Sequence, residues 1–360
     1  MVDHSSPSRR PLGRASLLLR LAAIGVVVGA VAGAFAYVNG TLDPQRLRPK
    51  TLVNALETNN GVHPGYRRNH SKGVCVAGYF ESGPAARAYS SAQVFHEART
   101  PVIGRFALPS GNPYAPDSSV PIRSLALQFS QANGQQWRTG MNSMPVFPVG
   151  TPEAFYQMLK AGAPDPATGK PNPASMPAFF ASHPEAAPFL AWVKTAKPSA
   201  SYATESYNGI NGFYLINANG QRQAVRWGVV PISQDTKEAA APAGADFLQQ
   251  DLEQRLLAGP VRWQLLITLA NPADPVDDAS KVWAGEHTVL NAGTLVLDSS
   301  QPQLSGDCRD INFDPLILPS GIEASNDPLL AARSAAYASS YLRRTGEVSQ
   351  LHNAVQESKP

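Results

Sequence analysis

The chain has 360 residues, of which 43% are hydrophobic and only 16% charged, with 32 prolines and 28 glycines. This composition predicts a compact, loop-rich globular protein and excludes a largely disordered one. The net charge of +3 is too small to indicate nucleic acid as a partner, and we expect none. Cys75 and Cys308 form neither a disulfide framework nor a zinc site, and whether a single bridge joins them stays open.

The N-terminus reads as a separate unit. An apolar, uncharged run, Leu21–Val38, is near the lower limit of about 17 residues for crossing a bilayer. It follows a polar segment whose arginines are Arg9, Arg10, Arg14 and Arg20. This basic flank predicts that residues 1–20 stay in the cytoplasm and that everything after residue 38 is exported. Residues 39–50 are then a linker, and residues 51–360 form the functional domain.

Two fates of the apolar run stay open. If the run is retained, the protein is a single-pass inner-membrane protein with its domain on the periplasmic side. If it is removed, the protein is periplasmic. Ala34-Phe35-Ala36 offers a small-x-small cleavage site, and Ser8-Arg9-Arg10-Pro11-Leu12 is an imperfect match to a twin-arginine export signal.

Beyond residue 50, strand and helix signals follow one another along the chain. Apolar or alternating patterns predict strands at Val74–Phe80, Thr100–Ala107, Arg123–Phe129, Gly212–Asn217, Gln223–Val230, Arg262–Ala270 and Thr294–Asp298. Caps and amphipathic spacing predict helices at Thr151–Gly162, Pro184–Lys197 and Phe247–Gly259. Asn219-Gly220 is the strongest hairpin signal. About eight antiparallel strands with inserted helices predict an α+β fold, a closed β-barrel surrounded by helices.

The last predicted helix, Asn326–Thr345, carries the most specific chemistry. Asp327 is a good N-cap, and proline at position 328 suits the first helical position. The spacing places Arg333, Tyr337 and Arg344 on one face. A guanidinium one turn before a phenol favours the phenolate, a hard oxygen donor suited to ferric iron. Taken alone, the helix could equally be an alanine-rich surface helix with an ordinary tyrosine.

The run Leu318–Tyr337 resembles the proximal haem segment of the catalase superfamily. That segment reads Pro-x-Gly-Ile-Glu-x-Ser, then an acidic residue and a leucine pair, then Arg-x-x-x-Tyr. The resemblance implies that Tyr337 is the axial iron ligand and Arg333 its phenolate partner. Arg344 falls where the family places an arginine that binds a haem propionate. The family also implies haem b and an eight-stranded antiparallel barrel of the catalase type.

The stretch Arg67–Phe80 is similar to the catalase distal segment, in the pattern Arg-x-x-His-x-Lys-Gly followed by Gly-Tyr-Phe. By this resemblance His70 is the distal acid–base and Arg67 a propionate ligand, and Arg105 lies at another propionate position. An imidazole with a near-neutral pKa can take a proton from the attacking peroxide oxygen and return it to the leaving one. In isolation, a lone histidine or arginine of this kind is more often structural.

Asn142-Ser143-Met144-Pro145-Val146-Phe147 resembles the family's Asn-Asn-x-Pro-Val-Phe, whose second asparagine lies in the distal pocket. Alignment on Pro-Val-Phe puts Ser143 at that place and Asn142 one position early, so both are candidate catalytic residues. Ala107 stands where full catalases have a serine that supports the distal histidine. These departures leave His70 with fewer partners and count against strong hydrogen peroxide dismutation.

Full catalases continue past the proximal helix into further segments, whereas this chain ends soon after Thr345, as the small branch of catalase-related peroxidases does. The resemblance implies a haem peroxidase that reduces organic peroxides, with hydrogen peroxide as a further substrate. It would use an external reductant and a ferryl intermediate. Three alternatives stay open: a true hydrogen peroxide catalase, a non-enzymatic haem-binding module, and a lipid hydroperoxide isomerase. Neither the electron donor nor the oligomeric state follows from the sequence.

Overall fold

The structure is a computed structural model that describes residues 13–38, 47–232 and 244–357, the last seven of these by their backbone alone. Arg9, Arg10 and most of the predicted linker therefore lie outside the described residues. The chain divides into two units, Met1–Arg48 and Pro49–Pro360, each of which is described by itself. The division falls just before the predicted start of the domain at residue 51.

The first unit contains one helix, α1 (Arg14–Val38), among its described residues. It includes the predicted apolar run but begins earlier, so that Arg14 and Arg20 lie within its first turns. Its 25 residues at about 1.5 Å each exceed the hydrocarbon thickness of a bilayer, about 30 Å. By length and composition α1 is a candidate membrane span, and a signal sequence would have the same features.

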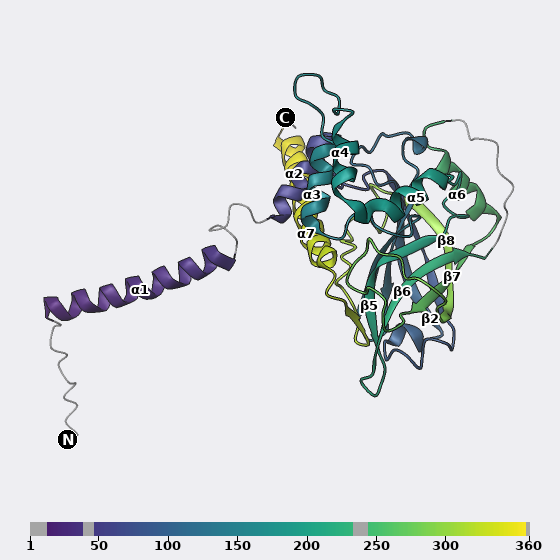
Figure 1. The fold of residues 1–360 in the computed structure, drawn as a ribbon, viewed down its shortest axis with the longest axis horizontal. Coiled ribbons are helices and arrows are strands. Elements are labelled where there is room, and N and C mark those ends of the chain that lie inside the picture. The colour runs from purple at the N-terminus through teal and green to yellow at the C-terminus, as the bar shows by residue number, and fades with distance from the viewer. Residues whose placement is uncertain (1–12, 39–46, 233–243, 358–360) are drawn as a thin grey trace. The chain divides into compact units, whose positions relative to one another are not determined.

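The second unit is built on one antiparallel sheet (Figure 1). Its strands are β1 (Gly73–Ser82), β2 (Arg99–Ala107), β3 (Ser124–Ser130), β4 (Gln136–Asn142), β5 (Tyr207–Ile216), β6 (Arg222–Pro231), β7 (Val261–Leu269), β8 (Val289–Pro302) and β9 (Ile322–Ala324). Their order is β4-β3-β2-β1-β8-β7-β6-β5-β9, and a further pairing of β4 with β5 closes β1–β8 into a barrel. The predicted eight-stranded antiparallel barrel is thus confirmed, with β9 added beside β5.

Most strands lie where the sequence predicts them, and the β5–β6 hairpin turns at Asn219-Gly220, where the glycine has φ 75°. The strand β8 is much longer than the predicted Thr294–Asp298. Neither β4 nor β9 was predicted. The alternating burial of β4 is regular, but the strand is short and contains Gly140, which weakens its signal.

Aromatic side chains fill the barrel. Trp137 stacks on Phe129 with ring centroids 4.6 Å apart and meets Trp227 edge-on at 5.0 Å. The indole nitrogen of Trp227 donates to Thr139 Oγ1 at 2.9 Å, which satisfies the one polar atom that this ring brings into the core. The barrel interior is therefore packed, and any cavity large enough for a cofactor has to lie outside it.

The helices of this unit are α2 (Pro49–Asn60), α3 (Pro152–Ala161), α4 (Ser175–Ser182), α5 (Ala187–Thr195), α6 (Phe247–Ala258) and α7 (Pro328–Glu357). Figure 1 shows α2, α3, α4 and α7 gathered on one side of the barrel and α6 on another. Thr151 Oγ1 caps α3 by accepting from the Ala154 N–H, as predicted. The predicted helix Pro184–Lys197 is a 3-10 turn followed by α5, and α7 continues well past Thr345.

The helix α2 was not predicted, and its first residues fall within the predicted linker. It packs on α7 through charges: Arg68 Nε donates to Glu57 of α2 at 2.6 Å and also pairs with Glu347 of α7. Arg343 of α7 binds the same Glu57 at 2.6 Å. Only 5% of Arg68 is exposed, so these carboxylates neutralise a charge that water cannot reach.

We predict that Arg68→Ala lowers the free energy of unfolding by about 1–3 kcal/mol, because it removes the guanidinium from Glu347 and leaves Glu57 with Arg343 alone, while both carboxylates keep some access to water. Arg99→Ala is the matched control, since Arg99 also pairs with a glutamate, Glu81, but is exposed. Urea denaturation of both variants measures the difference. Equal stabilities of the two variants would show that the Arg68 pairs do not hold α2 to α7.

Candidate active site

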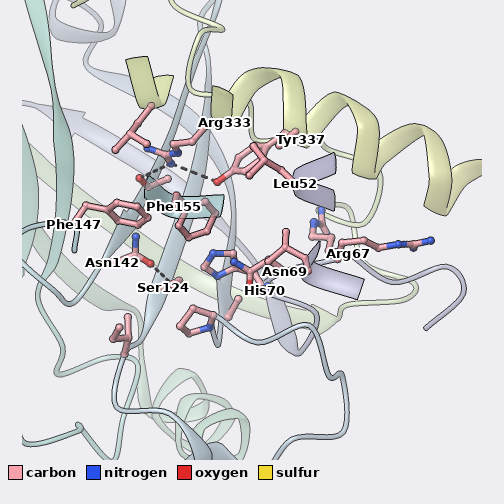
Figure 2. Close-up of a pocket in the computed structure, with 18 of the residues that line it drawn as sticks. Leu52, Arg67, Asn69, His70, Ser124, Asn142, Phe147, Phe155, Arg333 and Tyr337 are labelled. Atoms are coloured by element: carbon pink, nitrogen blue, oxygen red, sulfur yellow. Dashed lines mark hydrogen bonds between the residues drawn. The ribbon is translucent and has the colours of Figure 1, made fainter. Parts of the chain in front are cut away.

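A cavity of about 540 Å³ lies between the barrel and the helices that cover it. Its wall includes every predicted site residue except Ser143: Arg67, His70, Arg105, Asn142, Arg333, Tyr337 and Arg344. These residues come from the loop before β1, from β2 and β4, and from α7. Figure 2 shows Arg333 and Tyr337 projecting from α7 on one side of the cavity, with His70 and Asn142 across from them.

On the α7 side, the candidate ligand is held by a chain of hydrogen bonds. Arg333 Nη2 donates to Tyr337 Oη at 3.5 Å, and Arg333 Nη1 donates to Asn211 Oδ1. Asn211 Nδ2 in turn donates to Asp327 Oδ2 at 2.7 Å. The other carboxylate oxygen of Asp327 accepts from the Leu329 N–H at 2.9 Å and so caps α7. One carboxylate thus fixes both the start of the helix and, through Asn211, the guanidinium beside the phenol.

Asn211 is a site residue that the sequence did not predict. It lies where the register of β5 against β6 shifts, between Gly209 and Phe213. Such an irregularity redirects a side chain that a regular strand would hold on one face. The glycines at 209 and 212 were the available signal, since glycine inside a strand often marks a bulge.

Three guanidiniums, those of Arg67, Arg105 and Arg344, form a second wall of the cavity, which we call the cationic wall. Arg105 and Arg344 are 3% and 4% exposed. The pKa of Arg67 lies well below its usual value because of burial and because Arg105 and Arg344 are close. Burial likewise lowers the pKa of Arg105, to about 10.

These three arginines bind mostly neutral acceptors. Arg67 Nη2 donates to the carbonyls of Cys308, Arg309 and Ile311 at 3.0, 3.2 and 3.0 Å. Arg105 Nη2 donates to Gln303 Oε1, and Arg344 Nη1 to the Arg309 carbonyl. Among the described residues, the one carboxylate that pairs with these arginines is Asp310, 3.8 Å from Arg344 and largely exposed. The wall therefore carries uncompensated positive charge and is suited to bind an anion, such as a pair of carboxylates.

His70 has an unusual backbone conformation and an imidazole with a lowered pKa. Its φ of 55° makes it the one non-glycine residue with positive φ in the described part of the chain, and such conformations cluster at functional sites. Burial, and then Arg105, Arg333 and Arg67, lowers the pKa of its imidazole to about 3. Its Nδ1 is buried without a hydrogen-bond partner among the described residues, as expected from alanine at position 107. The imidazole is therefore neutral and faces the cavity, but its pKa is not the near-neutral one expected from the sequence, because burial and three guanidiniums disfavour its protonated form.

Asn142 faces the cavity and Ser143 does not. Ser124 Oγ donates to Asn142 Oδ1 at 2.6 Å, which leaves the amide nitrogen toward the cavity (Figure 2). Ser143 Oγ instead accepts from the Arg123 N–H at 3.0 Å. Asn142 is the last residue of β4, and consecutive residues of an extended chain point to opposite sides. Strand phase, which alignment on Pro-Val-Phe ignores, thus turns Asn142 into the cavity and Ser143 away from it.

The remaining wall is apolar and was also not predicted. It is formed by side chains of α2 to α5 and the loop after β4, among them Leu52, Phe147, Phe155, Met158, Phe180 and Phe189. The spacing of Leu52, Val53 and Leu56 in α2 was a signal for one apolar helical face. No carboxylate is among the described residues that line the cavity.

The residues present fit haem. A phenol beside a guanidinium suits ferric iron, the three arginines suit two propionates, and the apolar wall suits the macrocycle. The two cysteines are bonded to each other and no free cysteine is described, so neither offers a thiol for covalent attachment.

Comparison with known proteins supports this picture. The catalase family model matches residues 40–354. A catalase-related peroxidase of Synechococcus elongatus is 39% identical over 91% of this chain and 96% of its own length. A catalase-related peroxidase of Mycolicibacterium paratuberculosis is 30% identical over 83% of this chain and 96% of its own length.

The fold agrees as well. A crystal structure of a fungal catalase superposes with a TM-score of 0.69 at 21% identity, covering 84% of this chain and 64% of the fungal chain. These matches show that the chain belongs to the catalase family, a family of oxidoreductases that act on peroxide and normally bind haem.

Proposed function

We propose that the protein is a haem-dependent peroxidase that reduces organic peroxides with an external electron donor. The observation that carries the proposal is that one cavity joins a phenol–guanidinium pair, a neutral imidazole, a cationic wall and an apolar wall. The names of the relatives point the same way, since two of them are catalase-related peroxidases.

In this proposal Tyr337 Oη would bind the iron, with the Arg333 guanidinium beside it at 3.5 Å. Arg67, Arg105 and Arg344 bind the propionates, whose negative charge offsets the repulsion among the three guanidiniums. Haem b, held without covalent bonds, is the form consistent with two cysteines that are already bridged. When bound, haem supplies the iron at which the peroxide O–O bond is cleaved and the electrons for that cleavage.

Across the cavity from Tyr337, His70 transfers the hydroperoxide proton and Asn142 orients the peroxide. His70 is neutral, so it can accept the proton of the hydroperoxide and return it to the leaving oxygen, which departs as the alcohol. The amide nitrogen of Asn142 can donate a hydrogen bond to the peroxide and so orient it. The external donor then supplies two electrons for each peroxide reduced, with two protons completing water and the alcohol.

The apolar wall also bears on the substrate. Side chains of α3 to α5 that the macrocycle leaves uncovered would give an alkyl or aryl group a binding surface, which favours an organic peroxide over hydrogen peroxide. Reaction with hydrogen peroxide as a catalase is the second candidate function, because His70 and Asn142 could orient that smaller peroxide too. Oxygen evolution from hydrogen peroxide without added reductant distinguishes the two.

We propose further that α1 carries the rest of the chain across the cytoplasmic membrane, as a retained anchor or as a signal that is removed. Two arginines in its N-terminal part, and none from Leu21 to Val38, favour export of the residues after the helix. The Cys75–Cys308 disulfide supports the same conclusion, since such bridges persist in oxidising compartments such as the periplasm.

We expect Tyr337→Phe to abolish stable haem binding, because it removes the phenol oxygen to which Arg333 Nη2 donates at 3.5 Å. Haem content and the Soret spectrum of the purified variant measure this. Tyr341→Phe is the control, since Tyr341 lies one turn further along the same helix and also lines the cavity. Full occupancy and an unchanged spectrum in Tyr337→Phe would show that the ligand is another residue.

Replacing His70 with glutamine should keep haem bound but slow the reaction with cumene hydroperoxide by about 10²–10⁴-fold. Stopped-flow recording of the Soret change on mixing with peroxide gives the rate. Since the pKa of His70 is about 3 and not 6.5, the imidazole stays neutral as the pH falls through 6.5. The wild-type rate should therefore show no loss with a midpoint near pH 6.5, and such a loss would contradict a permanently neutral base.

Export predicts that protease added to spheroplasts digests residues 49–360 of a C-terminally tagged chain. The tag should disappear from intact spheroplasts as quickly as a known periplasmic marker does. A tag that is degraded only after the cytoplasmic membrane is lysed would place the domain in the cytoplasm.

A further inference from the structure

A single irregular segment, residues 303–314, accepts hydrogen bonds from every arginine of the cationic wall. Arg67 binds three of its carbonyls, Arg344 binds the Arg309 carbonyl, and Arg105 binds the side chain of Gln303. Asn312 and Phe313 of the same segment line the cavity. The position of the cationic wall therefore depends on the backbone of this segment.

The segment has no helix or strand of its own to fix that backbone. Its covalent tie is the disulfide between Cys308 and Cys75 of β1, which joins residues 233 apart in the sequence. The contact with β1 is close: a Cβ added to Gly306 would lie 2.9 Å from Cys75 Cβ. Both cysteines are at most 1% exposed and pack with Phe313, so the bridge forms the back of the cavity wall.

We propose that the Cys75–Cys308 disulfide is a positioning element of the haem site, which holds the carbonyls that orient Arg67 and Arg344. This inference rests on the proposed function, since the arginines it positions are those assigned to the propionates. The carbonyl of Cys308 accepts a hydrogen bond from Arg67 at 3.0 Å. The disulfide therefore restrains the same residue that binds Arg67. Retention of haem then depends on an oxidised bridge.

Other contacts of the segment do not replace this constraint. Asp314 accepts from Ser334 of α7 at 2.6 Å, and the Asp307 N–H donates to Gln301 at 2.9 Å. Between them, Arg138 Nη1 of β4 donates to the Asn312 carbonyl at 2.5 Å, and the Arg309 N–H donates to the Gly306 carbonyl at 2.9 Å within the segment itself. Neither bond ties Cys308 to the barrel, and the carbonyls that bind Arg67 belong to Cys308, Arg309 and Ile311. Without the bridge, the carbonyls between those contacts gain freedom, and each loses part of its hydrogen bond to a charged donor.

The test compares the wild-type holoprotein with Cys75→Ala/Cys308→Ala, using the rate at which haem passes to excess apomyoglobin. We expect the variant to release haem about tenfold faster or more, the size expected from weakening a hydrogen bond to a charged group. Leu252→Ala is the matched control, because Leu252 is fully buried in α6 and does not line the cavity. It should lower the melting temperature comparably without accelerating haem release.

A second measurement uses the wild-type chain, in case the double variant does not fold. Dithiothreitol converts the bridge to two thiols and is itself oxidised to its cyclic disulfide. Haem release should accelerate in step with the thiols counted, while far-UV circular dichroism stays unchanged. Acceleration that follows loss of secondary structure instead would assign the bridge a general stabilising role only.

The Arg67→Ala variant tests whether the disulfide acts by positioning Arg67 or only by stabilising the fold. In that background the loss of the bridge should accelerate haem release less than in the wild type, since one of the positioned groups is already absent. An equal acceleration in both backgrounds, or none in either, would overturn this inference alone. A wild-type chain that takes up no haem would overturn the proposed function together with it.

Discussion

The constraint on which the site depends is a cluster of like charges in a place that water scarcely reaches. Burial lowers the pKa of Arg67, Arg105 and Arg344, and in Arg67 and Arg105 the neighbouring guanidiniums lower it further. Among the described residues, one exposed carboxylate, Asp310, pairs with them. Neutral carbonyls can satisfy guanidinium N–H groups, but they do not cancel the charge. A dianionic cofactor would relieve this repulsion, which under the proposed function would give haem binding a driving force beyond the burial of its ring.

The barrel brings these groups together through its irregular points. It closes where β4 meets β5, at the pair Asn142 and Asn208, so the seam of the barrel is also the place of a distal side chain. The irregular pairing of β5 with β6 presents Asn211 to Arg333, and the unusual φ of His70 turns its imidazole into the cavity just before β1. The regular strands form the packed interior of the barrel. Of the cavity residues, Asn142 lies where a strand ends, Asn211 where the strand pairing shifts, and His70 where the backbone has a positive φ.

The sequence predicted what is encoded locally. A helix start at Asp327 and a hairpin at Asn219-Gly220 depend on neighbouring residues, and both agree with the structure. The phase of β4 could not be read from a motif alignment, because the pairing partners of a strand decide which side chains face the cavity; hence Ser143 was placed where Asn142 lies. The hydrogen bond between Asn211 and Arg333 and the disulfide each join residues over a hundred positions apart. The glycines at 209 and 212 signal an irregular strand, but no local pattern names the partner.

The arginines of the cationic wall also affect the pKa of His70, across the cavity. Burial is the largest cause of the low pKa of His70, and Arg105, Arg333 and Arg67 add to it in the same direction. Propionates bound to Arg67 and Arg105 would cancel much of the charge contribution. They would leave the contribution of burial in place, and the haem ring would remove further water from the imidazole. Because burial, the larger cause, would survive cofactor binding, we expect the imidazole to stay neutral in the loaded protein. No carboxylate among the described residues that line the cavity would stabilise its protonated form.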